Sequence, residues 1–537
     1  MGEPGLCSRC EGVDAEDLPA ACTLLEGGPC SACKERADIQ SQIKRLEEDI
    51  FKLKEKRHAL GTTMNEIHEP FIHKLPPEIG SHIFYLCLPS LDSHESDLWS
   101  AQEAEWNVPL RLGAVCRKWR EVAWATPNLW VAPLLEIKPS TAYSLANSLP
   151  SLFREWLGRS GLLPLTIFFF HAGYYEHGFH GLTSDNFLKM QRVEALKTAT
   201  DSVIQTIKSQ WSRVGNLYLD MGADMFERFS GCMQPSNMVG LELIVNGNRS
   251  PTQNFIAASN PTYLALTNFA PTSIDIGWDN VTRAVLARLD FKECVELLRR
   301  APALEYCKVY GWEVCVDDPA FDFNTVILHP RLRSLDSEHD ADFLGAINAP
   351  SLEEWMHDMG YGVQDNCVTM ISLLNRSNCS LKILNLVGES NFPKDLCTLL
   401  QATPSLERLF LAFEWEFKDI AIMDDIFTRL SCTNPNSDVS SGATSQSFLP
   451  HLQSLDCGAD NAAISPFTWD RIPQLYHQGH RRSLTLKSWA HKSHISDETA
   501  LELLHLIEEG VDLQIYDLET SRGFFKNFGN RMREESR

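Results

Sequence analysis

The chain has 537 residues, of which 44% are hydrophobic and 22% are charged, an ordinary composition for a globular protein. Its formal net charge of -23 at pH 7 argues against nucleic-acid binding, which requires a positive surface. The N-terminus has neither a basic nor an apolar signal region, and the longest apolar run, Leu162 to Phe170, is too short to span a bilayer. We therefore predict a protein of the cytoplasm or nucleus with reduced cysteines, which binds neither nucleic acid nor membrane.

Residues 1–36 are rich in Gly, Pro, Cys and acidic residues and have no apolar periodicity, so we expect a disordered tail. The tail contains two Cys-x-x-Cys pairs, Cys7 with Cys10 and Cys30 with Cys33. Four thiolates at this spacing are typical of a tetrahedral zinc site. Almost no aromatic or β-branched residue lies between the pairs to pack such a fold, so a tail with free thiols stays the alternative. No other cofactor is expected.

A heptad pattern runs through residues 37–69. Its apolar residues recur at alternating steps of four and three, and Arg57 takes the one seam position that is not apolar: Ile39, Ile43, Leu46, Ile50, Leu53, Leu60, Met64 and Ile67. This seam predicts a coiled-coil helix. Heptads define a seam but not a partner, so two interpretations stay open. The helix either self-associates through residues 39–67 or packs back on its own domain.

Residues 70–135 predict a small all-α domain. Pro70 ends the preceding helix, and the two prolines at 76 and 77 stand where a new helix start tolerates them. One apolar stripe at helical spacing includes Ile79, Ile83 and Phe84. After an acidic stretch a second stripe follows, made of Leu112, Val115, Cys116, Trp119, Val122 and Ala123.

A short phrase, apolar-x-x-apolar-x-apolar, recurs between residues 140 and 520, for example at Leu286/Leu289/Phe291 and Leu406/Leu409/Leu411. Most steps are about 18 to 29 residues long, the range of leucine-rich repeats, in which a strand and a helix alternate. We expect an irregular α/β solenoid with a parallel sheet and helices on its outer face. A polar segment at about 432–448 predicts a disordered insertion, and residues 521–537 a second tail.

The second face of the predicted sheet is the expected substrate surface, because alternate strand residues point away from the core. Simple solvation of the sheet is the alternative. The predicted positions are Asp290, Lys308, Tyr310, Asn385, Arg408, Phe410 and Asp456.

Catalytic motifs with a known residue spacing do not occur in the sequence. His171, His177 and His180 gather after the apolar run, where a polar loop is favoured over a metal site. Cys294, Cys307, Cys379 and Cys397 lie in apolar repeat patterns and are expected to be structural. We therefore predict a binding protein and not an enzyme.

The order of residues in 70–135 resembles the F-box motif, with a longer acidic loop from Ser90 to Asn107. The matching residues are Leu75, Pro76, Glu78, Ile79, Ile83, Phe84, Val115, Cys116, Arg117, Trp119, Arg120, Leu129 and Trp130. The whole layout is similar to a large class of F-box proteins of mushroom-forming fungi, in which a short coiled coil precedes the motif and irregular leucine-rich repeats follow it.

The resemblance implies a non-catalytic substrate-recognition subunit of a cullin–RING ubiquitin ligase. The F-box would bind the Skp-type adaptor, and the repeats would bind a protein substrate. The alternative is an F-box scaffold that works outside a ubiquitin ligase. The expected adaptor contacts are Leu75, Pro76, Ile79, Ile83, Phe84, Val115, Cys116 and Trp119.

Overall fold

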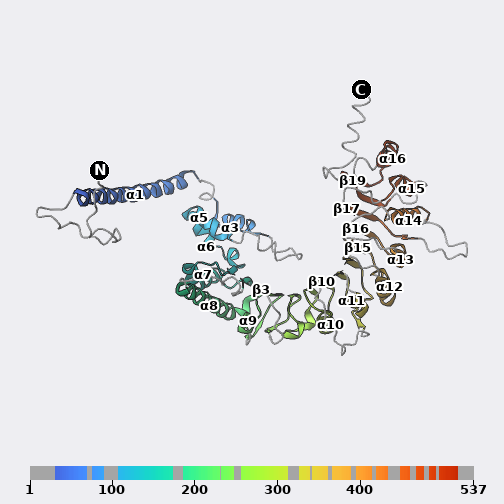
Figure 1. Cartoon of the computed structure of the whole chain (residues 1–537), viewed down its shortest axis with the longest axis horizontal. Coiled ribbons are helices and arrows are strands. Elements are labelled where there is room, and N and C mark those ends of the chain that lie inside the picture. Colours follow the sequence, from blue (N-terminus) through green and yellow to red (C-terminus); the bar gives the residue numbers. More distant parts are fainter. Residues whose placement is uncertain are drawn as a thin grey trace, which may run out of the picture. The chain divides into compact units, whose positions relative to one another are not determined.

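The computed structural model divides the chain into two compact units, Met1–Trp130 and Val131–Arg537 (Figure 1). Among the described residues, no helix combines the length and the apolar character needed to cross a lipid bilayer. The structure describes residues 31–68, 75–89, 107–172, 186–229, 232–246, 255–311, 326–338, 341–360, 366–388, 395–413, 419–432, 448–459, 467–476, 483–490 and 495–517.

The first unit opens with one long helix, α1 (Ser31–His68). The heptad pattern predicted that this helix begins at residue 37. It begins at Ser31, so the last six residues of the expected tail belong to the helix. The described residues after it form the short helices α3 (Pro77–Leu86), α5 (Val108–Val115) and α6 (Arg117–Trp124), and then a 3-10 turn, η1 (Pro127–Trp130). Pro77 and Pro109 stand in the first turns of α3 and α5, where their missing N–H groups need no helical partner.

The second apolar stripe was expected to form one helix, but the chain breaks at Cys116. This residue is extended, with φ -155° and ψ 174°, and it caps α6. Its thiol accepts a hydrogen bond from the backbone N–H of Trp119 over 3.4 Å. Helices α5 and α6 pack against each other, so apolar residues continue on both sides of the break. The spacing of apolar residues therefore could not reveal where the first helix ends.

Aromatic side chains form the core between the short helices. Phe84, Leu129 and Trp130 are buried, and the Trp130 indole N–H donates to the Ala123 carbonyl over 2.8 Å. The Trp130 ring meets the Trp124 ring edge to face, with centroids 5.3 Å apart. The Leu-Trp pair that closes the sequence motif is therefore a core element of this unit.

Gly113 is the point of closest approach between α5 and α6. A Cβ atom added there would lie 1.9 Å from Cζ3 of Trp124. We therefore expect Gly113→Ala to lower the free energy of unfolding by about 1–3 kcal/mol, because the crowded ring must move. The control is Gly158→Ala, since Gly158 lies inside a helix with nothing within 4 Å of the added atom. Urea denaturation should show the control to be neutral or stabilised, and equal behaviour of the two variants would contradict the prediction.

In the described residues of the second unit, fourteen strands form one large parallel sheet. Each strand pairs in parallel with the next in this order: β1 (Leu134–Ile137), β2 (Leu165–His171), β3 (Val214–Gly222), β5 (Gly240–Asn246), β7 (Tyr263–Thr267), β9 (Arg283–Ala287), β10 (Tyr306–Tyr310), β12 (Ser334–Glu338), β14 (Glu354–Asp358), β15 (Ile383–Gly388), β16 (Arg408–Phe413), β17 (Ser454–Ala459), β18 (Thr485–Ala490) and β19 (Leu513–Asp517). The expected α/β fold with a parallel, repeat-like sheet is confirmed.

Helices connect most of the strands, and Figure 1 shows α10 to α16 following one another along one side of the sheet. Their apolar faces and the inward strand residues make one continuous core. This arrangement buries each strand on the helix side. The helices are α7 (Tyr143–Arg159), α8 (Asn186–Ser209), α10 (Phe291–Arg300), α11 (Ala341–Ala346), α12 (Asn366–Ser377), α13 (Leu396–Gln401), α14 (Asp419–Cys432), α15 (Ile472–Tyr476) and α16 (Asp497–Glu508).

The repeats between β3 and β9 depart from the expected alternation of strand and helix. A second ladder of β4 (Cys232–Ser236), β6 (Phe255–Ser259) and β8 (Ile274–Asp275) lies here, with 3-10 turns at Pro271–Ser273 and Trp278–Asn280. Pro271 and Gly277 make this stretch a poor helix former. A short strand or turn therefore takes the place that a helix has elsewhere.

Two predicted boundaries also move. The helical domain was expected to end at residue 135. However, β1 pairs with β2, and Leu134 lies opposite Phe168 in this pair, so residue 134 already belongs to the sheet of the second unit. The solenoid therefore begins before the predicted residue 140. Of the segment predicted as an insertion at about 432–448, the structure describes only the two ends: Cys432 ends α14, and Phe448 is buried. Residues 433–447 lie outside the described part of the chain, as do residues 521–537.

The repeat phrase at Leu286/Leu289/Phe291 was placed five residues too late. Strand β9 ends at Ala287, and its register places Ala284 opposite Cys307 and Leu286 opposite Val309. An alanine at the central core position hid the true phrase. Leu289 and Phe291 lie instead at the entrance to α10.

Polar residues occupy two core positions in the middle of the sheet. Ser337 on β12 and His357 on β14 are register neighbours, where other strands carry leucine. The Ser337 hydroxyl lies 3.0 Å from Nδ1 of His357 and accepts a hydrogen bond from the Trp355 indole over 3.1 Å. Burial of these polar groups is tolerated because they bond to one another.

Candidate interaction surfaces

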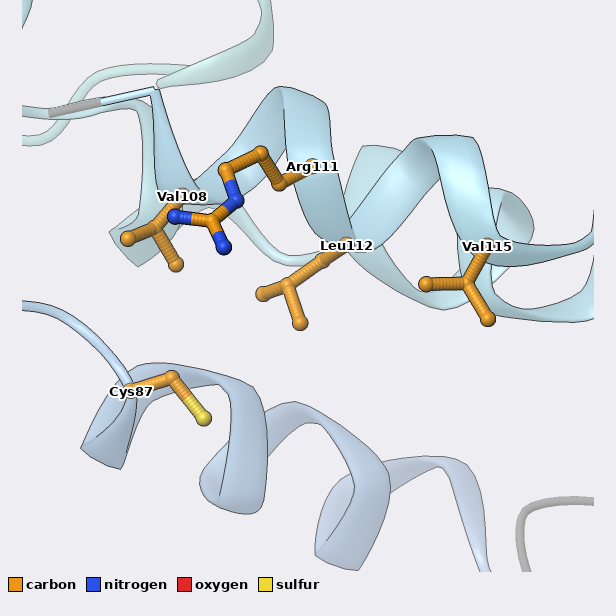
Figure 2. A pocket seen from close by; sticks show the side chains of 5 residues that line it. All are labelled: Cys87, Val108, Arg111, Leu112 and Val115. Carbon is orange, nitrogen blue, oxygen red and sulfur yellow. The ribbon is translucent and has the colours of Figure 1, made fainter. Parts of the chain in front are cut away.

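A groove separates α3 from α5 in the first unit (Figure 2). Its pocket has a volume of about 350 Å³ and is lined by Cys87, Val108, Arg111, Leu112 and Val115. Figure 2 shows Cys87 at the end of α3, with the other four side chains on α5 across the opening. Three of the four side chains on α5 are aliphatic, so the groove suits an apolar side chain of a partner.

The two helices that border this groove also expose large apolar side chains. Their exposure ranges from 46% to 69%, which is high for residues of this type, at Ile79, Tyr85, Leu86, Leu110 and Val115. Two short helices that expose five such residues have an apolar surface of the kind that can dock a partner.

The expected adaptor contacts fall into three groups. Pro76, Ile79 and Val115 are exposed, whereas Leu75, Ile83, Cys116 and Trp119 are half-buried. Phe84 is 1% exposed and packs on the Trp119 ring, with centroids 4.9 Å apart. Its prediction as a direct contact is wrong, because its side chain lies inside the unit.

Sequence reasoning missed several residues of this surface, namely Tyr85, Leu86, Val108, Leu110 and Arg111. They lie beside the matched motif positions and not on them. The signal that could have found them is the excess of apolar residues in α3 and α5 over what two packed faces require.

The indole N–H of Trp119 lies at the inner side of this surface. It is buried and has no hydrogen-bond partner among the described residues. A buried donor without an acceptor carries a desolvation cost.

Basic residues give the region of α5 and α6 a charge opposite to that of the whole chain. Residues 108–124 contain four basic side chains and one acidic one, Glu121, which makes a local charge of +3. Lys118 lies 3.4 Å from the Glu121 carboxylate, and Arg120 donates to the Gly113 carbonyl over 2.8 Å. The patch therefore favours a partner with acidic residues at the rim.

The second face of the large sheet brings together most of the predicted substrate positions. Asn385, Phe410 and Asp456 are register neighbours on β15, β16 and β17, and Lys487 on β18 extends the row. The Lys487 ammonium lies 3.3 Å from the Asp456 carboxylate. Arg408 begins β16 and is exposed.

Lys308 and Tyr310 lie together on β10. The Lys308 ammonium is 3.1 Å from Asp336 and 5.6 Å from the centre of the Tyr310 ring. Asp290 does not share this face, and its prediction as a surface position is wrong. It caps α10, where its carboxylate accepts from the Glu293 backbone N–H over 2.9 Å in a capping box.

Two aromatic groups on the second face were missed. Arg283 stands between Tyr263 and Tyr306 in the register, with its guanidinium 4.3 Å from the Tyr306 ring centre. Near the last strands, Trp489 stacks on Tyr516 with centroids 5.5 Å apart. Tyr, Trp and Arg are the residue types that dominate binding energy at protein interfaces. Correct registers would have found them, because they alternate with core residues.

Part of this face is desolvated. Burial raises the pKa of the Tyr218 hydroxyl to about 12, and the nearby Glu242 carboxylate adds to the rise. Burial also raises the pKa of Asp220 to about 6, although a hydrogen bond from Asn246 opposes the change. The Phe168 and Tyr218 rings stack here, with centroids 4.5 Å apart.

Burial also governs the cysteines of the repeats. It raises the pKa of Cys307 and of Cys397 to about 12, with Asp336 and Asp425 respectively adding to the rise. Thiols with such pKa values stay protonated at neutral pH and are poor nucleophiles.

The candidate metal ligands lie mostly outside the described residues, which include neither Cys7, Cys10 and Cys30 nor His177 and His180. Cys33 lies in the first turn of α1. His171 ends β2, where burial lowers its pKa. The described residues contain no group of three or more His, Cys, Asp or Glu side chains that could hold a metal ion. The zinc site stays a prediction.

Neither a scan against protein-family models nor a search of curated proteins finds a match to this chain. Its function is therefore inferred from its own residues and their geometry.

Proposed function

We propose that residues 75–130 form an F-box that docks a Skp-type adaptor, and that the chain is the non-catalytic substrate-recognition subunit of a cullin–RING ubiquitin ligase. The observation that carries the proposal is the apolar surface on α3 and α5. It coincides with the segment in which residues follow the F-box order, and the two helices that carry it border a groove open to a partner side chain.

The energetics of this surface fit a stable complex. Burying one large apolar side chain contributes about 1.5–3 kcal/mol. Five such residues are exposed here, and together they can offset the cost of association. The basic residues of α5 and α6 would then steer an acidic partner toward the surface and orient it.

The large sheet has the second role in this proposal. We assign its strands and helices to irregular leucine-rich repeats that hold a protein substrate on the second face. Two aromatic and basic clusters, around Arg283 and around Lys487, provide anchors for such a partner. A receptor of this kind contributes proximity, because it holds the substrate near a ubiquitin-loaded enzyme without supplying catalytic groups of its own.

The test is the affinity of the purified chain for a purified Skp-type adaptor, measured by titration calorimetry. Ile79→Asp is expected to weaken binding by about 30-fold or more, since it puts a charge on the exposed apolar surface of α3. Leu162→Asp is the matched control, because Leu162 is 94% exposed and belongs to the second unit. Its affinity should equal that of the unmodified chain.

Two results would overturn the proposal. One is an unmodified chain that shows no adaptor binding, and the other is equal binding by Ile79→Asp and the control. Circular dichroism of both variants checks that the exposed substitutions leave the fold intact. Adaptor binding without recovery of a cullin would support the scaffold alternative.

A further inference from the structure

Helix α1 presents an uncovered apolar stripe. The eight apolar seam residues have exposures from 41% for Ile43 to 68% for Ile67. The stripe follows one side of a helix of 38 residues. Such a stripe in water is unfavourable, and a helix with this pattern is normally completed by a second helix.

The seam residues fall into regular heptad positions. The step of four from Ile39 to Ile43 makes Ile39 a d position and Ile43 an a position. The a positions are then Ile43, Ile50, Arg57 and Met64, and the d positions are Ile39, Leu46, Leu53, Leu60 and Ile67. The residues beside the seam are Gln40, Glu47 and Lys54 at e, and Gln42, Asp49 and Lys56 at g. In a coiled coil, these flanking charges decide which helix pairs with which and in which direction.

A parallel pair of two α1 helices is disfavoured by its charges. Arg57 would face Arg57 of the second copy inside the seam, with Lys54 and Lys56 close to both. Two like charges in one desolvated layer repel each other. Only Asp49 would meet an opposite charge across the seam, at Lys54 of the second copy.

An antiparallel pair resolves this conflict in one register. Ile50 then faces Leu53 of the second copy, and Arg57 faces Leu46 instead of another arginine. The outer layers pair Ile43 with Leu60 and Ile39 with Met64. Every layer contains at least one aliphatic residue, and residues 35–68 of the two helices overlap completely.

The flanking charges agree with this register. Glu47 faces Lys54 of the second copy across one side of the seam, and Asp49 faces Lys56 across the other. Symmetry doubles both contacts, so four opposite-charge pairs form and no like-charge pair does. Within one copy, Asp49 lies 3.6 Å from Lys52. Both of these side chains are largely exposed, so this contact is weak and competes little with the contact between Asp49 and Lys56 of the second copy.

We infer that α1 pairs with α1 of a second copy of this chain as an antiparallel coiled coil in this register. The partner is the chain itself because one sequence supplies both halves of each charge pair. The inference concerns α1 alone and does not depend on the proposed adaptor binding.

The experiment measures the molar mass of the full chain in solution by sedimentation equilibrium. The unmodified protein is expected at twice its chain mass of 60.6 kDa. Lys56→Glu should raise the dimer dissociation constant by about tenfold or more, because Asp49 then faces a like charge at two places. The double variant Lys56→Glu with Asp49→Lys should restore the dimer, since the pair is reversed and not lost.

Lys52→Glu is the matched control. It makes the same change of charge at an outer heptad position and should leave the dimer unchanged. A parallel dimer would show another pattern. Position 56 would face Gly61 and lie near the two Arg57 side chains, so Lys56→Glu would not weaken the dimer, whereas Asp49→Lys would repel Lys54. That pattern, or an unmodified chain that stays monomeric, would overturn the inference. Circular dichroism checks that α1 stays helical in each variant.

Discussion

Trp130→Ala is expected to lower the free energy of unfolding of the first unit by about 3–5 kcal/mol, which is enough to unfold a small domain. The indole is fully buried and contacts the Trp124 ring, and its N–H donates to the Ala123 carbonyl over 2.8 Å. The substitution removes the ring, leaves a cavity and removes the shorter of two hydrogen bonds to the Ala123 carbonyl, which still accepts from the Thr126 N–H over 3.3 Å. Urea denaturation followed by tryptophan fluorescence measures the change.

Trp130→Phe separates packing from hydrogen bonding. It keeps most of the ring volume and loses only the bond to Ala123, so a smaller loss of about 1–2 kcal/mol is expected. Adaptor binding should fall in Trp130→Ala because the unit unfolds, whereas Ile79→Asp should weaken binding without unfolding. If Trp130→Ala and the unmodified chain unfold at the same urea concentration, Trp130 is not a core residue.

Trp355→Ala is expected to destabilise the middle of the large sheet by about 3–5 kcal/mol. The Trp355 ring is 1% exposed, and its N–H donates to the Ser337 hydroxyl, which also contacts His357. The substitution leaves a cavity and removes one member of a buried polar group whose other members depend on it.

The neighbouring residue provides the control for this prediction. Met356 follows Trp355 on the same strand but points to the second face and is 42% exposed. Met356→Ala should change stability by only about 0.5 kcal/mol. In a repeat array, each repeat is stabilised mainly by its contacts with the adjacent repeats. Hydrogen exchange in Trp355→Ala should therefore rise first in β12, β14 and β15. Uniform exchange along the whole sheet would contradict this local effect.

The apolar stripes of the short helices show how far a linear pattern reaches. Ile79, Ile83 and Phe84 follow one helical spacing, yet Phe84 is buried and Ile79 is 47% exposed. Spacing identifies an apolar side of a helix but cannot tell which residues on that side are buried by the same chain and which are exposed. The packing of α6 against α3 decides this, because Trp119 covers Phe84 and leaves Ile79 uncovered.

The repeats show the same limit in another form. Regular leucines correctly indicated strands such as β15 and β16, and their register follows the predicted phrase. Where the core residue is Ala284 the phrase was misread, and Asp290 was assigned to the sheet face instead of a helix cap. Larger side chains from neighbouring elements fill the core volume beside a small residue. These neighbours are distant in sequence, so the local spacing of apolar residues does not reveal them.

The sequence by itself determined the long helix, the short helical segment, the parallel repeats and their order, because these depend on side-chain periods of 3.6 and 2 residues and on local breakers such as Pro77. The tertiary structure alone decided the break at Cys116, the polar pair Ser337 and His357, and the aromatic clusters on the second face. These features join residues from different repeats or helices. Their energies arise only when strand registers and helix contacts bring those residues within a few ångströms of one another.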